Sequence, residues 1–314
     1  MRVLVTGASG FSGSFVARGL ARAGCDVVGV HRRDTPFLAQ LADEPLVRLV
    51  RVDLAGAAEL VGPFDAVVHT AATSPAPGVT AARMVRDNVG ALQALIAAAE
   101  AWRCRGFVFF SSLSLHGAIA SGVVDETTPI VDPDVYGATK FLCEGLLAER
   151  SEALPSLSLR LPGVLGPGAH RNWLSGVAAQ LQAGATISAF HLDAPFNNAA
   201  HIADIARLVQ TALGRGWRGA DAVVLGARGA ISVGSAIGRL AAGLGVELRL
   251  VERSSAKPSF VLSSDRAIER WGYDPLEIGA LIDRYAAEIV QGESSTAFGS
   301  RSPSPVGRCD ASRG

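Results

Sequence analysis

The sequence predicts a doubly wound α/β fold, in which helices cover both faces of a parallel sheet. Short runs rich in Val, Leu and Phe alternate with Ala/Leu-rich amphipathic segments from the N-terminus onward. The short runs lack polar alternation, which is typical of strands buried on both faces. Because strands separated by helices pair in parallel, six or seven of these runs are expected to form one sheet.

The order of the elements follows from these runs and from the segments between them. The predicted strands lie at residues 3–5, 27–30, 47–52, 66–69, 107–110 and 157–159. The helices between them are expected at about 13–23, 36–42, 56–62, 80–101 and 135–150. This alternation defines a main domain over residues 1–165.

The regular alternation weakens after Pro167-Gly168. Further helices are expected at about 173–183, 201–213, 232–243, 264–271 and 276–290, joined by scattered short strands. We therefore predict a smaller C-terminal lid of mixed α/β structure over 166–291, from which segment 196–226 returns to the main domain. Residues 292–314 are rich in Ser, Gly and Pro, so a disordered tail is expected there.

Composition and charge exclude several classes of protein. The chain has 314 residues, with 29 Lys plus Arg against 29 Asp plus Glu, so no general attraction to nucleic acid or to an anionic membrane is expected. It contains no apolar run of the ~20 residues that cross a bilayer. The N-terminus does not read as a signal peptide. The four cysteines form no C-x-x-C pair, so we expect no metal site and a cytoplasmic protein.

A glycine-rich segment, Thr6-Gly7-Ala8-Ser9-Gly10-Phe11-Ser12-Gly13, joins the first strand to the first helix. Glycine allows the tight turn, the close approach of a pyrophosphate and close packing of helix on strand, while the N–H groups of the new helix face the phosphates. A merely structural turn is the alternative. Because strand, loop and helix occur in the required order, we favour a Rossmann-like dinucleotide site with Gly7, Gly10, Phe11, Ser12 and Gly13 at the cofactor.

The G-x-x-G-x-x-G spacing resembles that of the extended short-chain dehydrogenase/reductase family, which includes nucleotide-sugar epimerases, dehydratases and reductases. Asp53-Leu54 and His69-Thr70-Ala71-Ala72 are similar to family segments that contact adenosine, and Asn88 opens a similar stretch of the central helix. Leu161-Pro162 resembles the part that lies against the nicotinamide. The resemblance implies cofactor contacts from Asp53, Leu54, Thr70, Ala71, Ala72, Asn88, Leu161 and Pro162.

Two arginines end the second predicted strand. In a dinucleotide site, a carboxylate there accepts hydrogen bonds from the ribose 2′-hydroxyl, whereas Arg32 and Arg33 offer guanidinium groups that suit a 2′-phosphate. A solvated basic loop, partly neutralised by Asp34, is the alternative. We favour NADP as cofactor, with NAD as the alternative.

A Tyr-x-x-x-Lys pair carries the predicted chemistry. Tyr136 and Lys140 lie four residues apart, on one face of an expected helix. A neighbouring ammonium lowers the pKa of a phenol toward the working range, which makes Tyr136 a usable acid/base. By resemblance to the family, Ser112 is the catalytic serine, and Tyr136 and Lys140 also contact the cofactor.

The residues that follow Ser112 limit the kinds of reaction that are expected. Leu113-Ser114 stands where, by resemblance, dehydratases carry an Asp-Glu pair and 3,5-epimerases carry a cysteine. Carbonyl reduction or alcohol oxidation on a sugar or nucleotide sugar therefore remains, together with 4-epimerisation through tightly bound NAD. A non-catalytic dinucleotide sensor is a third hypothesis, against which the intact Tyr/Lys pair counts. The arginines favour a reductase.

Substrate contacts are less well defined by the sequence. Arg171 and Asn172 could bind a phosphate at the mouth of the lid, or Asn172 could cap the helix that begins there. Gly163 replaces an asparagine that, by resemblance, many nucleotide-sugar enzymes carry. The resemblance also implies a homodimer formed through helices 80–101 and 135–150.

Overall fold

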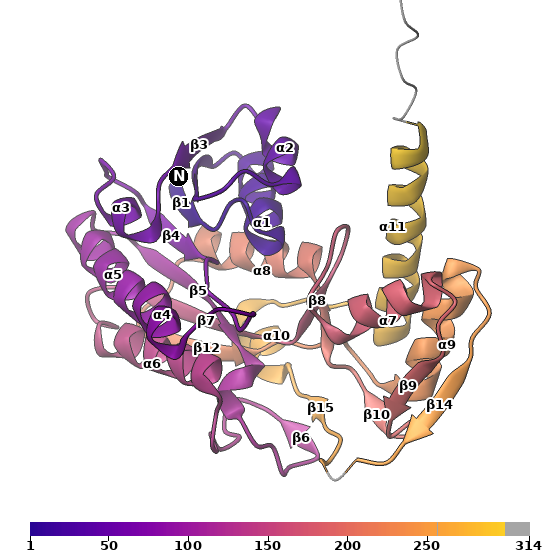
Figure 1. The fold of residues 1–314 in the computed structure, drawn as a ribbon. Coiled ribbons are helices and arrows are strands. Elements are labelled where there is room, and N and C mark those ends of the chain that lie inside the picture. Colours follow the sequence, from indigo (N-terminus) through magenta and orange to yellow (C-terminus); the bar gives the residue numbers. More distant parts are fainter. Residues whose placement is uncertain (256, 299–314) are drawn as a thin grey trace, which may run out of the picture.

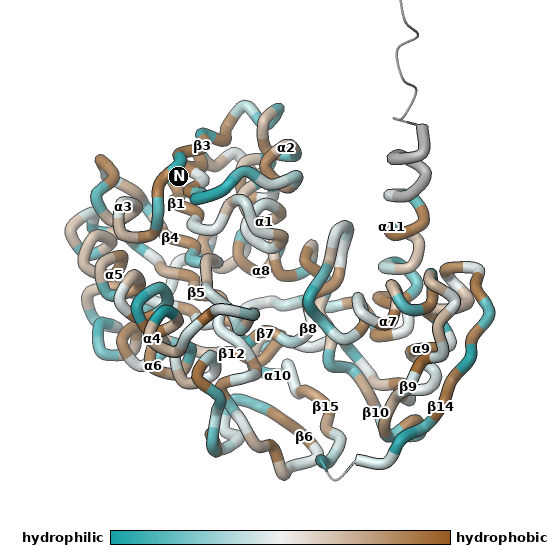
Figure 2. The backbone as a smooth tube through the Cα atoms, viewed as in Figure 1, coloured by the Kyte–Doolittle hydropathy of each residue, from teal (hydrophilic) through white to brown (hydrophobic). Residues whose placement is uncertain are grey.

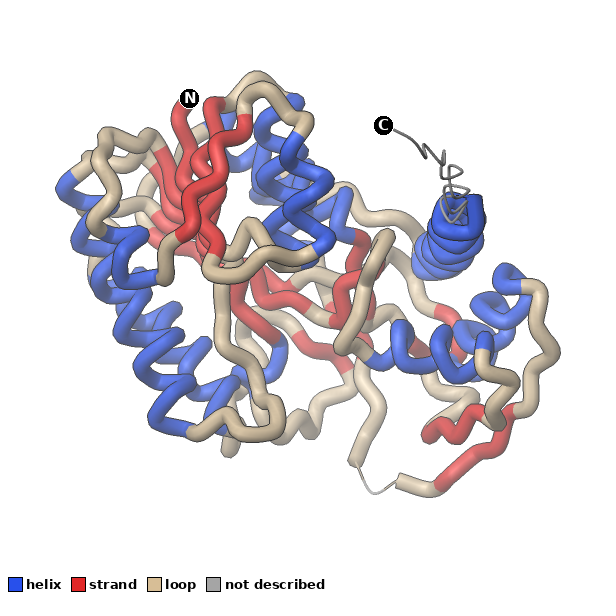
Figure 3. The backbone as a smooth tube through the Cα atoms, turned by 45° about the horizontal axis from the view of Figure 1, so that its top comes forward, coloured by secondary structure: helices blue, strands red, loops and turns tan. Residues whose placement is uncertain are grey.

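The protein is described by a computed structural model that covers residues 1–255 and 257–298, with only the backbone described for 293–298. Its centre is a seven-stranded parallel sheet with the order β12-β7-β5-β4-β1-β2-β3, flanked by helices (Figures 1 and 3). This confirms the predicted fold class. The strands are β1 (Arg2–Thr6), β2 (Asp26–His31), β3 (Val47–Arg51), β4 (Ala66–His69), β5 (Gly106–Ser112), β7 (Ser156–Leu161) and β12 (Ala220–Val224).

The two faces of the sheet pack against different helices. Alternate residues of a strand point to opposite faces: in β1, Val3 and Val5 join one core cluster, and Leu4 joins the other. The first cluster packs under α1 (Phe11–Arg22), α2 (Pro36–Ala42), α8 (Ile202–Arg215) and α10 (Asp265–Trp271). The second packs under α3 (Leu54–Ala58), α5 (Ala91–Ala101) and α6 (Val135–Glu149). Figure 2 shows hydrophobic and hydrophilic residues mixed along α6, as expected for a helix with one buried side.

The predicted helix over 80–101 is interrupted. Its residues form α4 (Ala81–Met84), a π-helical turn (Val85–Gly90) and then α5. The extra residue of a π turn bulges the helix, and such turns are frequent at functional sites. Apolar periodicity did not reveal this turn, because the hydrophobic pattern runs through it.

Two later segments lie in the main sheet layer. β12 pairs with β7 as the seventh strand, and α8 packs against α1. Helix α10, which the sequence placed in the lid, also packs against β12 and α8. Asp221 of β12 explains this position, because its carboxylate binds Arg266, Arg270 and the indole of Trp271.

The lid is built from short elements around its own core. Its elements are β8 (Gly163–Leu165), α7 (Trp173–Gln182), β9 (Ile187–Phe190), β10 (Pro195–Phe196), β11 (Ala199–His201), β13 (Ile231–Ser232), α9 (Val233–Leu244), β14 (Leu250–Arg253) and α11 (Ile278–Phe298). The strands pair two by two: β8 with β11, β9 with β14, and β10 with β13. A further pair, β6 (Val123–Val124) with β15 (Val261–Leu262), links the main domain to the chain that follows β14.

Helix α11 continues to Phe298, so the first part of the expected disordered tail is helical. The overall content of Ser, Gly and Pro did not reveal this continuation of the helix. The prolines and most of the glycines of the tail come after its first residues. The rest of that predicted tail, 299–314, lies outside the described residues. Among the residues that the structure does describe, none forms a helix long and apolar enough to span a membrane.

Candidate active site

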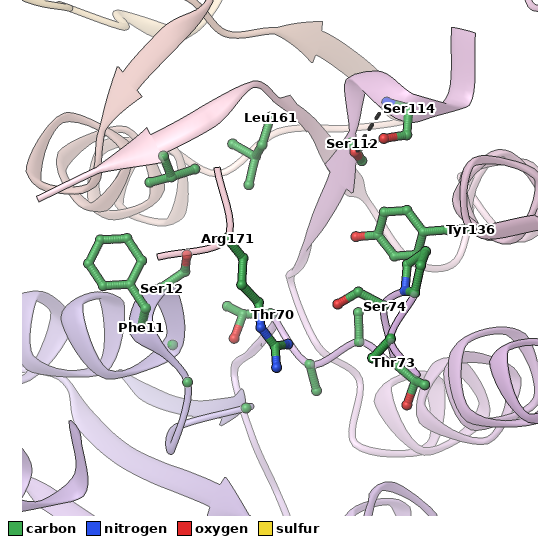
Figure 4. A pocket seen from close by; sticks show the side chains of 18 of the residues that line it. Phe11, Ser12, Thr70, Thr73, Ser74, Ser112, Ser114, Tyr136, Leu161 and Arg171 are labelled. Atoms are coloured by element: carbon green, nitrogen blue, oxygen red, sulfur yellow. Dashed lines mark hydrogen bonds between the residues drawn. The ribbon is translucent and has the colours of Figure 1, made fainter. Parts of the chain in front are cut away.

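One large cleft lies at the carboxyl ends of the sheet strands and extends to the lid. Its volume is about 1480 Å³, and it is lined by the glycine segment, the ends of β2, β4, β5 and β7, and the start of α7. Ligands of open α/β sheets bind at this edge, where the loops of neighbouring strands diverge. Figure 4 shows side chains of the glycine segment, of the ends of β4, β5 and β7, of α6 and of the loop before α7 around the cleft.

The glycine segment forms a cradle that side chains would fill. Gly7 has φ +78°, and a Cβ added there would lie 2.7 Å from Thr70 Oγ1. A Cβ on Gly13 would lie 2.1 Å from the carbonyl oxygen of Gly7. Gly10 is the N-cap of α1 and provides no capping side chain, so the first N–H groups of α1 face the cleft. Gly7, Gly10, Phe11, Ser12 and Gly13 all line it. This cradle fits the diphosphate of a dinucleotide.

Arg32 and Arg33 also line the cleft, immediately after β2. Asp34, the candidate for neutralising them, instead pairs with Arg51 at 3.3 Å and lies 3.6 Å from His31. In the described part of the chain, neither Arg32 nor Arg33 takes part in an ion pair. Both guanidinium groups are therefore available to an anion at this end of the cleft.

The residues predicted to contact adenosine lie at the ends of β3 and β4. Asp53 caps α3 by accepting a hydrogen bond from the Gly56 N–H at 2.9 Å, and Leu54 begins that helix. Thr70 donates its hydroxyl hydrogen to the carbonyl oxygen of Thr6 at 2.7 Å, which leaves Ala71 and Ala72 as the wall beyond β4. Asp53, Leu54, Thr70, Ala71 and Ala72 all line the cleft.

Asn88 does not line the cleft, which corrects the expectation of direct cofactor contact. It is 3% exposed within the π turn. Its amide accepts from the Thr73 N–H at 2.7 Å and donates to the Thr73 carbonyl oxygen and to Thr139 Oγ1. Because Thr73 follows the adenosine wall and Thr139 belongs to α6, Asn88 holds these two parts of the cleft in place.

Ser112 and Tyr136 both line the cleft. Ser112 ends β5, and its Oγ accepts from the Ser114 N–H at 3.2 Å. Tyr136 stands in the first turn of α6, which Asp134 caps by accepting from the Gly137 N–H at 2.7 Å. Figure 4 shows the Tyr136 hydroxyl and the Ser112 side chain directed into the cleft.

A buried ion pair ties α6 to the strands of this site. Glu144 of α6 accepts from Ser111 Oγ at 2.5 Å and pairs with Arg160 of β7 at 2.8 Å. Ser111 precedes Ser112, and Arg160 precedes Leu161, which with Pro162 lines the cleft. The pair therefore links the three elements that carry Ser112, Tyr136 and Leu161.

Lys140 lies beneath the cleft wall and does not line it, contrary to the predicted contact with cofactor. It is 2% exposed, and its Nζ donates to the carbonyl oxygen of Phe110 at 2.6 Å. The same Nζ lies 4.5 Å from the ring centroid of Phe109 and 5.7 Å from that of Tyr136. A buried ammonium is stabilised by such a carbonyl and such ring faces.

The pKa of Tyr136 differs from the sequence-based expectation. Burial raises it to about 12, with the charges of Asp134 and Cys143 acting in the same direction. Burial also lowers the pKa of Lys140 to about 8. Desolvation disfavours the charged form of each group, and the distance between them weakens the effect of the lysine on the phenol. In this structure Tyr136 is a protonated phenol at neutral pH.

On the lid side, the structure favours the capping role for Asn172. Asn172 accepts from the Ser175 N–H at 2.9 Å and donates to the carbonyl oxygen of Val164 at 3.0 Å, as the N-cap of α7. Its amide is thus engaged by the backbone, while Asn172 also lines the cleft, so its contact with substrate stays a prediction. Arg171 lines the cleft and is exposed.

Several other cleft residues were not singled out by the sequence. They include Thr73 and Ser74 after β4, Ser114 after β5, and Asn198 and Phe260 on the lid side. Polar residues directly after a strand were a usable signal for the first three. No such signal pointed to Phe260, which reaches the cleft from a distant part of the chain.

A model of the NAD dependent epimerase/dehydratase family matches residues 3–221. The chain belongs to this family. Membership confirms the resemblance predicted from the motifs. The match includes the glycine segment, Ser112, Tyr136 and Lys140.

Curated relatives of the chain carry names of nucleotide-sugar enzymes. It is 33% identical over 155 residues to dTDP-glucose 4,6-dehydratase of Streptomyces niveus, covering 45% of this chain and 46% of that protein. It is 29% identical over 184 residues to UDP-glucose 4-epimerase of Streptomyces lividans, covering 54% of each. The chain spans about half the length of the curated relatives it matches.

Solved structures show the same fold along nearly the whole chain. UDP-glucuronic acid 4-epimerase from Bacillus cereus in complex with NAD superposes with a TM-score of 0.80 and 22% identity, over 93% of this chain and 97% of that one. UDP-glucose-4-epimerase from Stenotrophomonas maltophila, with bound NAD and formylated UDP-arabinopyranose, gives 0.79 and 23%, over 94% and 99%. At this identity the likeness establishes the fold.

Proposed function

We propose that this chain is an NADP-dependent oxidoreductase that reduces a carbonyl group on a sugar or nucleotide sugar, with Ser112, Tyr136 and Lys140 as its acting residues. The observation that carries the proposal is that Ser112 and Tyr136 line the same cleft as the glycine cradle. Residues 1–165 supply most of the cofactor site, and the lid supplies the outer wall.

The mechanism follows from the state of the two hydroxyl groups. When bound, NADPH supplies the hydride that reduces the carbonyl carbon. Ser112 donates a hydrogen bond to the carbonyl oxygen, and Tyr136 transfers its proton to that oxygen, so that an alcohol forms. The Lys140 ammonium beneath Tyr136 stabilises the phenolate until it takes a proton from solvent. Because burial raises the pKa of Tyr136 to about 12, the phenol carries the proton that this step transfers at neutral pH.

The cofactor preference rests on Arg32 and Arg33. Their guanidinium groups have no ion-pair partner in the described part of the chain, and a planar fork matches phosphate oxygens. We infer that they bind the 2′-phosphate. Initial rates of carbonyl reduction with NADPH and with NADH test this: kcat/KM should be higher with NADPH. A value with NADH that equals or exceeds it would overturn the assignment.

A 4-epimerase that retains NAD is the second candidate, supported by the relatives and solved structures named as 4-epimerases. An epimerase keeps its reduced cofactor bound while the ketone intermediate rotates in the site. A reductase instead releases its cofactor after each reaction. Native mass spectrometry of the purified protein separates the two. Retained NAD, with turnover of a nucleotide sugar in the absence of added nicotinamide, would favour the epimerase.

A homodimer through α5 and α6 completes the proposal. Phe141 and Leu142 of α6 are 47% and 53% exposed, and Val85 of the neighbouring π turn is 47% exposed. Exposed apolar side chains grouped on two adjacent helices are typical of protein interfaces. Light scattering coupled to size-exclusion chromatography tests this, and Leu142→Glu should shift a dimer to a monomer.

A further inference from the structure

Arg171, for which the sequence suggested phosphate binding, presents its guanidinium group to the cleft. Arg171 precedes α7, is exposed and lines the cleft. In the part of the chain that the structure describes, it makes no hydrogen bond or ion pair. Figure 4 shows its side chain extending from the lid loop into the cleft, on the side where Ser12 and Thr70 lie.

The loop that carries Arg171 is held over the glycine cradle by aromatic contacts. The neighbouring His170 stacks on Phe37 of α2, with ring centroids 6.0 Å apart, and meets the edge of Phe11, the first residue of α1, at 6.3 Å. Gly168 packs against Phe37 so closely that a Cβ there would lie 3.0 Å from its ring. These contacts place the loop beside the start of α1, where the cradle opens.

The backbone at Arg171 is also unusual. Its φ is +60°, in the left-handed region that L-residues other than Asn, Asp and Gly rarely adopt. Residues held there against their preference cluster at ligand sites.

The glycine cradle contributes no positively charged side chain to the cleft. The residues Gly7 to Gly13 include no cation. The other arginines that line the cleft are Arg32 and Arg33 at the end of β2 and Arg86, which pairs with Asp87 at 3.2 Å. The N-terminus of a helix supplies about half a unit of positive charge, whereas the diphosphate bridge of a dinucleotide carries two negative charges.

We propose that Arg171 binds the diphosphate bridge of the cofactor, so that the lid contributes a cation to the cofactor site. This inference rests on the proposed function, since it requires a bound dinucleotide. The proposal gives the arginines of the cleft two roles. Arg32 and Arg33 distinguish NADP from NAD, whereas Arg171 contributes equally to the binding of both cofactors.

Binding without turnover tests the division. Isothermal titration calorimetry would measure the Kd of NADP, of NAD and of 2′-AMP, which lacks the diphosphate bridge, for the wild-type chain and for Arg171→Asn. Asparagine tolerates the left-handed backbone, so the variant should fold. Losing a charge-assisted contact should raise the Kd of NADP and the Kd of NAD by about tenfold each. The Kd of 2′-AMP should change less than about twofold. Arg171→Lys, which keeps the charge, should lie between.

Arg103→Asn is the matched control, because Arg103 has φ +57°, is exposed and does not line the cleft. Its Kd values should equal those of the wild type. Unchanged Kd values of NADP and NAD in Arg171→Asn would overturn the inference. This holds also if the KM of the carbonyl substrate rises in the same variant, because Arg171 would then contact the substrate and not the cofactor. A wild-type chain that binds neither dinucleotide would instead overturn the proposed function itself.

Discussion

The two walls of the cleft use their polar side chains in different ways. On the cofactor wall, Arg32 and Arg33 have no ion-pair partner in the described part of the chain. In the lid, most of the polar side chains serve the lid itself, and Arg171 is the exception. Asn172 caps α7 at the cleft. Behind the wall, Asn197 is 5% exposed and pairs with backbone groups of Ala227 and Leu262. His201 pairs with Glu288 of α11 at 3.0 Å.

The difference has a structural cause. In the seven-stranded sheet, neighbouring strands satisfy the backbone groups of each other, so side chains at the strand ends are free for ligands. The lid has only paired short strands, which leave backbone groups that side chains must satisfy. Asn197 shows this most clearly: its amide accepts from the Leu262 N–H and donates to the Leu262 carbonyl oxygen, both at 2.8 Å. A polar residue in the lid is therefore weaker evidence for ligand binding than one after a sheet strand.

The largest expected effect comes from the cofactor wall. Tyr136→Phe removes the proton donor, and kcat for carbonyl reduction should fall by about a thousandfold. The Kd of NADP should stay within about twofold, since the phenyl ring still fills the wall. Tyr273→Phe is the control, because the buried hydroxyl of Tyr273 has no hydrogen-bond partner in the described structure. Full activity in Tyr136→Phe would show that Tyr136 is not the proton donor, whereas a wild-type chain that binds NADP but reduces no carbonyl would favour the non-catalytic sensor.

The second effect tests whether Arg32 and Arg33 are free for a ligand. Replacing both with serine should lower the ratio of kcat/KM for NADPH over NADH by about ten- to a hundredfold, because the 2′-phosphate loses charge-assisted hydrogen bonds. Arg48→Ser, at an exposed arginine of β3 outside the cleft, should leave the ratio unchanged. A ratio that does not move in the double variant would mean that these arginines belong to a solvated loop.

The third effect concerns pH. Burial lowers the pKa of Lys140 from 10.5 to about 8. Carbonyl reduction should therefore be level below pH 8 and fall about tenfold per pH unit above it, as the ammonium loses its proton. Stability should move in the opposite direction: between pH 8 and 10.5 the unfolded chain binds this proton more tightly, so the free energy of unfolding contributed by Lys140 rises with pH.

Rates and urea unfolding measured from pH 6 to 10 would check both signs. A rate that stays level up to pH 10 would show that the charge of Lys140 is not needed. The lysine would then serve only to pack α6 against β5.

The smallest effect is expected on the lid wall. Asn172→Ala removes the cap of α7 and should lower the free energy of unfolding by about 1 kcal/mol. Because the amide of Asn172 is already engaged, the Kd of NADP and the KM of the substrate should change less than about twofold. Asn172→Ser, which still caps, should restore stability. A large rise in KM in both variants would show that the side chain reaches the substrate after all.

The sequence by itself determined the fold class and the composition of the cofactor wall. Strand, glycine segment and helix are contiguous, so the turn at Gly7, the tight packing at Gly13 and the arginines after β2 could be located from local order alone. The Tyr136/Lys140 pair was found in the same way, because helical spacing sets which residues share a face.

Tertiary structure decided what depends on distant parts of the chain. The depth at which Lys140 is buried, and hence the high pKa of Tyr136, comes from strand and helix packing around α6. Asn88 looks like a ligand residue until its backbone partners are known. Phe260 reaches the cleft from nearly a hundred positions beyond Leu161. Burial and long-range hydrogen bonds are set by all the elements packed around a residue, so neighbours in sequence do not reveal them.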